Sequence, residues 1–537
     1  MISRKALRLF PLALFPLALL VSFACAQNAP RHLYFRVTLD PGMKPASGRL
    51  LIFLEPGAAG SHTPMSQFRP SATSVAAKEV EGLEPGASVD VDVDDLAFPA
   101  PFSSLKPGTY QAHAVLDVAH SYAYAGPVPG DIESAVVALA DWTPGSGVEP
   151  AFVLNRVDEI PQPRPLPLAP DALAAAEKAT SPIDFISPAL SAFFGRDTHI
   201  RGWIVVPPGY ADHPRDRYPT VYWTHGFGAR LDTIRPYPVM IASRMAAGKM
   251  PPMIWIFLDE SLATGTHEFA DSVNNGPWGQ ALTAEFIPWI ETKYRMDAKP
   301  SGRFLEGHSS GGWATLQLQV NYPKIFGGTW STSPDPSDFH DFSQIDLYAP
   351  HANVYRRPDG TPWPIVRDHQ QVLATWEEFG HQEAVLGPYG GQVASFEWVF
   401  SPRGPDGRPL QMFDRVTGDV NPDVVAYWHD HYDLAHLVEA NWATRGHDLK
   451  GRIHLVVGTA DTFYLDGAAH RFEAVLNKLG GDPHFTYRDN RTHFDLYEEN
   501  GDRLAMMDEI AEQMYAVARP AAHWKRPEGA PPAILHP

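Results

Sequence analysis

A serine between two glycines is the first feature of this sequence that could do chemistry. Gly307-His308-Ser309-Ser310-Gly311 follows a strand-like segment at 303–306 and precedes a stretch at 313–321 with helical spacing. A nucleophile at a sharp strand-to-helix turn needs small neighbours, because the turn strains the backbone and exposes the hydroxyl. The five residues alone are a weak signal, but their context predicts that Ser309 is a nucleophile.

A nucleophilic serine needs a base, and the base needs an acid that orients it. We predict that Asp461 is the acid, because it comes just after a buried strand that ends at Gly458. We predict that His493 is the base, since a helix at 466–479 and a strand at 484–488 fill the interval between the two. Rival acids are Asp466 and Asp489, and rival bases are His447 and His470.

Acyl transfer also needs hydrogen-bond donors for the oxyanion that forms. The amide of Ser310 follows the nucleophile directly, and the amide of Phe227 lies in a glycine-containing loop after the strand at 220–224. We predict that these two amides form the oxyanion hole, although the loop could also be a plain glycine turn. The side chains that we predict to line the substrate pocket are His225, His308, Trp278 and Trp428.

Strands that alternate with helices must position these residues. From about residue 181, apolar strands alternate with helical stretches, which predicts a mainly parallel, doubly wound α/β sheet covered on both faces. The predicted strands are 198–206, 220–224, 253–258 and 453–458. Earlier in the chain, period-two alternation and Pro/Gly turns predict an all-β, immunoglobulin-like sandwich. Its strands include 33–39, 49–55, 89–93 and 110–118.

Three segments together resemble a known family. Tyr218-Pro219-Thr220-Val221-Tyr222 before His225-Gly226, then Asn275-Gly276-Pro277-Trp278-Gly279, then Gly307 to Gly312 look like the putative esterase family of α/β-hydrolases. That family includes esterase D, feruloyl and acetyl xylan esterases, mycolyltransferases and enterochelin esterases. The resemblance covers about 195–335 and 450–500, and it implies hydrolysis through an acyl-serine with no metal or other cofactor. A β-sandwich before the hydrolase domain is similar to the enterochelin esterase arrangement, whereas the N-terminal sequence itself matches no pattern.

The predicted organisation follows from these patterns. It consists of a signal peptide at 1–26, a β-sandwich accessory domain at 27–157, a proline-rich linker at 158–180, an α/β-hydrolase domain at 181–520 and a C-terminal tail at 521–537.

The interval between Ser309 and Asp461 is long. A compact domain needs about two strand–helix units there, or about 50 residues, which leaves an insertion at about 335–445. We expect a lid or pocket wall, whose deletion changes substrate preference more than the fold of the sheet. Trp428-His429-Asp430-His431, with His436 nearby, could chelate zinc if it formed a strand, but we predict a polar, hydrogen-bonded segment and no metal site.

Composition argues against several partners and chemistries. The formal charge of −19 over 537 residues disfavours nucleic acid and anionic lipid as partners. A basic start, an apolar run at 9–21 and Ala24-Cys25-Ala26 predict a secretory signal peptide cut after Ala26, and therefore a secreted or periplasmic protein without stable membrane insertion. Cys25 is the only cysteine, so cleavage there would exclude disulfides and thiol catalysis. Lipoprotein processing at Cys25 is the alternative.

The residues together predict a serine hydrolase that cleaves a small-molecule or saccharide-linked carboxylic ester. An acyltransferase or serine peptidase on the same scaffold, a metal-dependent hydrolase that uses the histidine-rich insertion, and a non-catalytic carbohydrate-binding or scaffold protein are the alternatives. The acyl and alcohol parts of the substrate and the oligomeric state are left open by the sequence.

Overall fold

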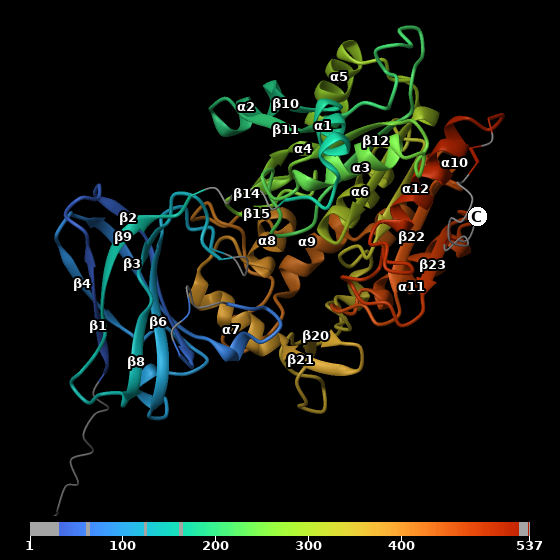
Figure 1. Ribbon diagram of the computed structural model, residues 1–537. Helices are drawn as coiled ribbons and strands as arrows, with labels where there is room; N and C mark the ends of the chain where they lie inside the picture. Colours follow the sequence, from blue (N-terminus) through green and yellow to red (C-terminus); the bar gives the residue numbers. More distant parts are fainter. Residues whose placement is uncertain are drawn as a thin grey trace, which may run out of the picture.

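The computed structural model describes residues 32–58, 60, 65–122, 126–159, 165–522, 524–525 and 535. The predicted signal peptide lies outside the described residues, as do 160–164 of the predicted linker and most of the predicted tail. An all-β unit occupies one side of the molecule, and a sheet covered by helices occupies the other (Figure 1).

The N-terminal unit is built from strands that share one hydrogen-bonded sheet. Within the described residues the sheet is nine-stranded, in the order β4-β1-β9-β7-β6-β2-β3-β5 with β8 paired to β6. Side chains alternate between buried and outward-facing along β1, because successive residues of a strand point to opposite faces. Phe35 of β1, Ile52 of β2 and Val91 of β4 all lie in one hydrophobic core, so the sheet curves around this core. An all-β unit is thus present, while a sandwich of two separate sheets stays a prediction.

The strands of this unit are β1 (Tyr34–Leu39), β2 (Ala46–Pro56), β3 (Ser74–Leu83), β4 (Ser88–Asp92), β5 (Ala97–Phe98), β6 (Gly108–Asp117), β7 (Ile132–Ser134), β8 (Val137–Trp142) and β9 (Ala151–Val157), with short 3-10 turns η1 (Pro70–Ala72) and η2 (Phe102–Ser104).

The second sheet carries the predicted chemistry. In the described part of the chain it has eight strands, in the order β10-β11-β13-β12-β18-β19-β22-β23. Strands β10 and β11 are antiparallel to their neighbours, and the remaining strands run parallel. The prediction of a mainly parallel sheet is therefore confirmed. Its strands are β10 (Thr180–Ile186), β11 (His199–Val205), β12 (Thr220–Thr224), β13 (Ile254–Leu258), β18 (Arg303–His308), β19 (Gly328–Thr332), β22 (Ile453–Gly458) and β23 (His484–Arg488).

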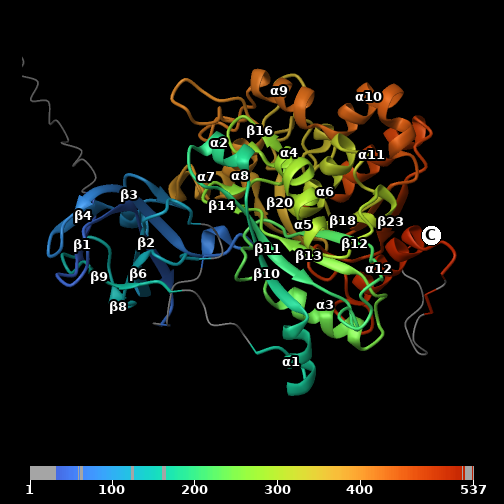
Figure 2. The same ribbon diagram turned by 90° about the horizontal axis from the view of Figure 1, so that it is seen from above.

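Helices cover both faces of this sheet (Figure 2). Because side chains alternate along a strand, Val221 and Trp223 of β12 enter one core with α3 and α12, whereas Tyr222 enters a second core with the helical segment at 278–293. No helix within the described residues is long and apolar enough to cross a membrane. The helices are α1 (Pro170–Lys178), α2 (Pro188–Phe194), α3 (Pro236–Ala246), α4 (Trp278–Gln280), the π-helical η3 (Ala281–Phe286), α5 (Ile287–Lys293), α6 (Ser310–Asn321), α11 (Asp466–Lys478) and α12 (Ala505–Ala518).

Short elements complete the loops of this unit: β14 (Ser261–Leu262), β15 (Gly265–Thr266), β16 (Asp271–Ser272), β17 (Gly276–Pro277), η4 (Pro300–Gly302) and η5 (Phe339–Asp341).

The segment predicted as an insertion shares its core with the sheet. A single hydrophobic cluster contains Trp376 and Trp428 of this segment together with Trp313 of α6 and Leu455 of β22. The segment therefore shares one core with α6 and β22, while the expectation that its deletion changes substrate preference more than the fold of the sheet stays a prediction. Its elements are β20 (Pro364–Asp368), β21 (Gln371–Thr375), α7 (Trp376–Leu386), α8 (Gln392–Phe400), α9 (Pro422–Tyr432) and α10 (Leu434–Leu449).

Helix α7 joins the two units, and the N-terminal sheet lies against it (Figure 1). Val385 and Leu386 at the end of α7 are buried in one cluster with Leu51 and Phe53 of β2. The guanidinium of Arg49 donates hydrogen bonds to the Val385 carbonyl at 3.0 and 2.7 Å. The all-β unit is thus fixed to the part of the chain that lies between Ser309 and Asp461.

Candidate active site

Ser309 occupies the turn between β18 and α6. Its backbone has φ 61° and ψ −126°, a combination that non-glycine residues rarely adopt. Its amide N–H donates to the carbonyl of Thr332 at 3.0 Å, which ties the turn to the neighbouring strand β19. The predicted strand–turn–helix is confirmed, and strain of this kind is found where a structure holds a functional side chain in place.

The glycines beside Ser309 are required by space. A Cβ on Gly307 would lie 2.3 Å from the carbonyl oxygen of Gly311, and a Cβ on Gly311 would lie 2.4 Å from that of His225. Both distances are far below van der Waals contact, and the atoms in the way belong to the backbone, so they cannot turn aside. The turn can therefore form only with glycine at both positions.

The loop after β12 lies directly against the nucleophile. A Cβ on Gly226 would be 3.0 Å from the Cβ and 3.6 Å from the Oγ of Ser309. Within the described residues, the amides of Phe227 and Ser310 donate no hydrogen bond. Two free donors on segments that flank the serine are the arrangement that an oxyanion hole needs.

His493 and Asp461 form a buried pair. Nδ1 of His493 lies 2.9 Å from Oδ2 of Asp461, and Oδ1 of Asp461 accepts a hydrogen bond from the Phe463 amide at 2.9 Å. Burial acts to raise the pKa of Asp461, but the charge and hydrogen bond of His493 outweigh it and hold the pKa below its usual value. The carboxylate is therefore ionised and fixes the imidazole with its proton on Nδ1.

The ring of His308, the residue before Ser309, lies 4.4 Å from the ring of His493. This contact places the His493–Asp461 pair next to the turn that holds Ser309. The hydroxyl of Ser309 itself has no hydrogen bond to a described residue. Burial lowers the pKa of His308 to about 3, so this imidazole is neutral and does not repel a positive charge on His493.

The rival acids and bases lie in other contacts. Asp466 pairs with Arg367 at 3.1 Å, and Asp489 accepts from the Thr459 hydroxyl at 3.4 Å. His470 stacks on Tyr487 with ring centroids 3.9 Å apart, and the His447 side chain is 96% exposed.

The residues predicted to line the pocket are mostly buried. His225 braces the loop, because its Nε2 accepts a hydrogen bond from the Glu260 amide at 3.0 Å and its Nδ1 lies 2.8 Å from the Gly226 carbonyl. Trp278 stacks on His267 at 3.6 Å, and Trp428 is fully buried with its N–H directed to Ser401 at 3.0 Å. The two tryptophans thus belong to cores, and the expectation that they line the pocket is corrected.

The buried carboxyl group of Asp335, beside the nucleophile, was not predicted from the sequence. Asp335 accepts a hydrogen bond from the Ser310 hydroxyl at 2.6 Å, and burial raises its pKa to about 6. Burial also raises the pKa of Glu260 and of Glu268 well above the usual value, and nearby carboxyl groups add to it. Asp335 follows strand β19 just as Asp461 follows β22. This position after a strand is the sequence feature that could have identified Asp335.

His429 and His431 lie on helix α9 and His436 lies on α10, so the strand that the zinc alternative required is not formed at these residues. Residues two apart on a helix point in different directions, so His429 and His431 do not share a side. His429 instead lies over His436, with ring centroids 3.8 Å apart, and its Nδ1 is 2.9 Å from the Asp430 carboxylate. Ligand atoms of these three residues lie within 4.8 Å of one another on the surface.

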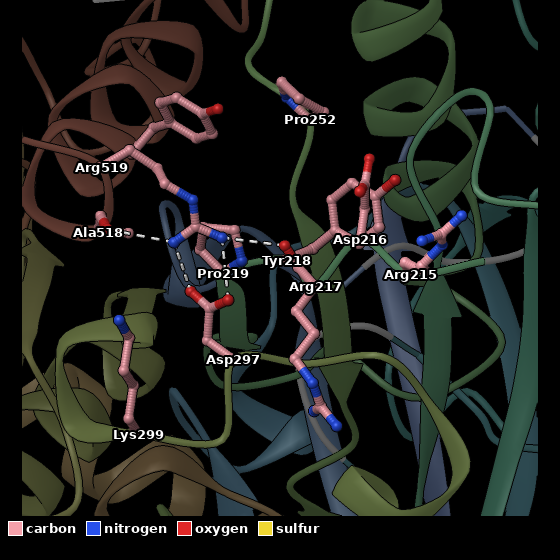
Figure 3. A pocket seen from close by; sticks show the side chains of 11 residues that line it. Arg215, Asp216, Arg217, Tyr218, Pro219, Pro252, Asp297, Lys299, Ala518 and Arg519 are labelled. Atoms are coloured by element: carbon pink, nitrogen blue, oxygen red, sulfur yellow. Dashed lines mark hydrogen bonds and ion pairs between the residues drawn. The ribbon is translucent and has the colours of Figure 1, made fainter. Parts of the chain in front are cut away.

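A hollow of about 700 Å³, whose lining side chains are drawn in Figure 3, opens at the opposite end of the sheet from Ser309. Pro219 and Pro252 line it just before β12 and β13 begin, whereas His225 and Ser309 follow strands at the other end. Arg519 and Asp297, which form an ion pair at 2.6 Å, are among the residues that line it. This hollow is therefore separate from the site around Ser309.

Comparison with known proteins gives matches to the part of the chain that carries Ser309. The family described as "Putative esterase" matches residues 191–503, which is more than half of the chain. Esterase MT1326 of Mycobacterium tuberculosis (strain CDC 1551 / Oshkosh) is 29% identical over 164 residues, covering 29% of this chain and 35% of that protein. The iron(III) enterobactin esterase of Dickeya dadantii (strain 3937) is 23% identical over 235 residues, covering 38% of this chain and 52% of that protein.

The chain therefore spans about a third to a half of the length of these relatives. Among solved structures, a ferulic acid esterase shares 14% identity, with 63% of this chain and 97% of that chain covered at a TM-score of 0.38. An S-formylglutathione hydrolase from Agrobacterium tumefaciens also shares 14% identity, with 62% and 94% covered at a TM-score of 0.36.

Proposed function

This chain belongs to the putative esterase family, and we propose that it hydrolyses a carboxylic ester through an acyl-enzyme formed on Ser309. The observation that carries the proposal is the strained serine turn with the Gly226 loop against it and two unused amides beside it. The curated relatives are named as esterases, which supports the same reaction class.

The proposed reaction uses the site in two steps. Oγ of Ser309 attacks the ester carbonyl while Nε2 of His493 accepts its proton, and the amides of Phe227 and Ser310 bind the negatively charged oxygen. The ester C–O bond then breaks, and His493 returns the proton to the departing alcohol. A water molecule, deprotonated by the same imidazole, releases the acid from the serine.

Asp461 acts by position and charge. Its carboxylate accepts a hydrogen bond from Nδ1–H of His493 at 2.9 Å, so Nε2 is the nitrogen left to face the serine. The same negative charge stabilises the imidazolium that forms when Ser309 is deprotonated.

The test is the Ser309→Ala variant, with Ser181→Ala on the exposed edge strand β10 as the matched control. We expect Ser309→Ala to lower kcat for p-nitrophenyl acetate by at least about a thousandfold, since the nucleophile is lost. A fluorophosphonate probe should label the wild type and Ser181→Ala at Ser309, as peptide mass spectrometry can show. Full activity in Ser309→Ala, or labelling at another serine, would refute the proposal.

A further inference from the structure

Three phenyl rings gather beside the His493 imidazole. Phe463 and Phe494 flank the imidazole with ring centroids 4.9 and 5.2 Å away, both nearly perpendicular to it. Phe68 packs edge-on against Phe494 at 5.5 Å and lies 6.5 Å from Phe463. Phe494 is 64% exposed, which is unusual for a side chain of this size and leaves an open aromatic surface next to the base.

The third ring comes from the N-terminal all-β unit. Phe68 lies in the segment 65–72 that leads into β3, nearly four hundred residues before Phe463 in the chain. Contacts to α7 hold this segment in place, because the Gln382 amide donates to the Pro70 carbonyl at 3.3 Å and the Ser71 hydroxyl donates to Glu378 at 2.9 Å. Met65 is buried at the same contact. These contacts therefore fix the position of Phe68 at the interface between the two units.

The position of the rings decides which half of an ester they would meet. In the proposed reaction, His493 gives its proton to the departing alcohol, so the alcohol lies next to the imidazole. The carbonyl oxygen lies toward the amides of Phe227 and Ser310. Side chains that pack around the imidazole therefore lie nearer to the alcohol than to the acyl group.

We propose that Phe68, Phe463 and Phe494 form a binding subsite for the alcohol part of the ester, and that this subsite favours an aromatic alcohol. The inference rests on the proposed function, and it adds a role for the all-β unit, which supplies one wall of the subsite. Aromatic rings in edge-on and offset arrangements attract one another more strongly than the burial of their apolar area alone would give. An alcohol that carries a ring should therefore bind to this surface more tightly than one without.

The experiment compares benzyl acetate with ethyl acetate, two esters that share an acetyl group and differ in the alcohol. Both form the same acetyl-enzyme, and the intrinsic difference between the two leaving alcohols is the same for every variant, so a change in the ratio of their kcat/KM values between variants reports on contacts with the alcohol. We expect Phe68→Ala to lower the benzyl-to-ethyl ratio about threefold to tenfold, because the benzyl group loses a ring contact that the ethyl group cannot make. Phe68→Leu, which keeps apolar volume but removes the ring, should lower the ratio in the same direction.

Phe193→Ala is the matched control, because it removes a 40% exposed phenyl ring that pairs with Phe194 on α2. It should leave the ratio unchanged. Ethyl phenylacetate carries the ring on the acyl side, and a loss confined to this ester would overturn the proposal, as would an unchanged ratio or an equal loss for both acetates in Phe68→Leu. Labelling of Ser309 by a fluorophosphonate in each variant separates a failure of this subsite from a failure of the proposed reaction.

Discussion

Glu306 is a carboxyl group inside the sheet, three residues before the nucleophile. It is fully buried, Oε1 accepts a hydrogen bond from the Tyr497 hydroxyl at 2.6 Å, and Oε2 has no partner among the described residues. Burial raises the pKa of Glu306 to about 8, although the bond from Tyr497 acts in the opposite direction. At neutral pH this group therefore keeps its proton in the folded protein.

A proton held only in the folded state makes stability depend on pH. The unfolded chain releases it near pH 4.5 and the folded chain near pH 8, so the folded state loses stability as pH rises through this window. Glu306→Gln removes the effect, and its free energy of unfolding relative to the wild type should increase between pH 5 and pH 8. We expect an increase of more than about 1 kcal/mol, since one pKa unit corresponds to about 1.4 kcal/mol. Urea unfolding at both pH values measures it, and an equal difference at the two would contradict the argument.

Some residues of the site could be predicted from the sequence, and the reason is their position after strands. Asp461 and His493 follow β22 and β23, whose runs are easy to recognise, and the structure brings the two side chains within hydrogen-bonding distance. Asp335 was missed because β19 is a short strand with Gly328 and polar residues. Phe68 could not be predicted at all, since its contact with Phe494 depends on how two units dock.

At the scale of elements, the insertion is where prediction and structure differ most. Its length and position were evident from the chain, but helices α7 and α8 are buried on several sides and therefore show no simple apolar periodicity. Trp428 of α9 is surrounded in the same way by Phe339, Phe342 and Phe400 rather than facing one partner. A pattern that is apolar all round predicts burial without saying against what.

Trp428 therefore tests whether the insertion and the sheet fold as one. Trp428→Ala leaves a large cavity in the shared core, and we expect the free energy of unfolding of the whole catalytic unit to fall by about 3–5 kcal/mol. Val416→Ala, at a position 82% exposed in the same insertion, should change it by less than about 0.5 kcal/mol. Near-UV circular dichroism during urea unfolding follows the core. A separate early transition, with the sheet unaffected, would show that the insertion folds independently.

At the scale of the whole molecule, the all-β unit and the catalytic unit meet through α7. Leu386 is 2% exposed in a cluster that also contains Phe53 and Val75 of the all-β unit. An interface that is apolar and reinforced by Arg49 is expected to hold the units in one arrangement rather than let them move freely.

Leu386→Asp places a carboxylate in this interface and leaves every residue of both sheets unchanged. We expect scanning calorimetry to resolve two transitions instead of one, and small-angle scattering to show a larger radius of gyration. The benzyl-to-ethyl ratio should fall as in Phe68→Ala, because the ring of Phe68 is withdrawn from Phe494. Val372→Asp, at a 51% exposed position on β21, is the control and should behave as wild type. A single unshifted transition in Leu386→Asp would argue against the coupling.

The core shared by the insertion and the sheet also bears on how such a protein can be modified by directed evolution. Trp376 and Trp428 lie in the same cluster as Trp313, one turn along the helix that begins beside Ser309. Many random substitutions across 335–445 would therefore impair folding, and those variants would be lost before any effect on substrate preference could be detected. A library that keeps the buried positions unchanged and varies exposed positions near the site, such as Phe494, offers new selectivity with less risk to the fold.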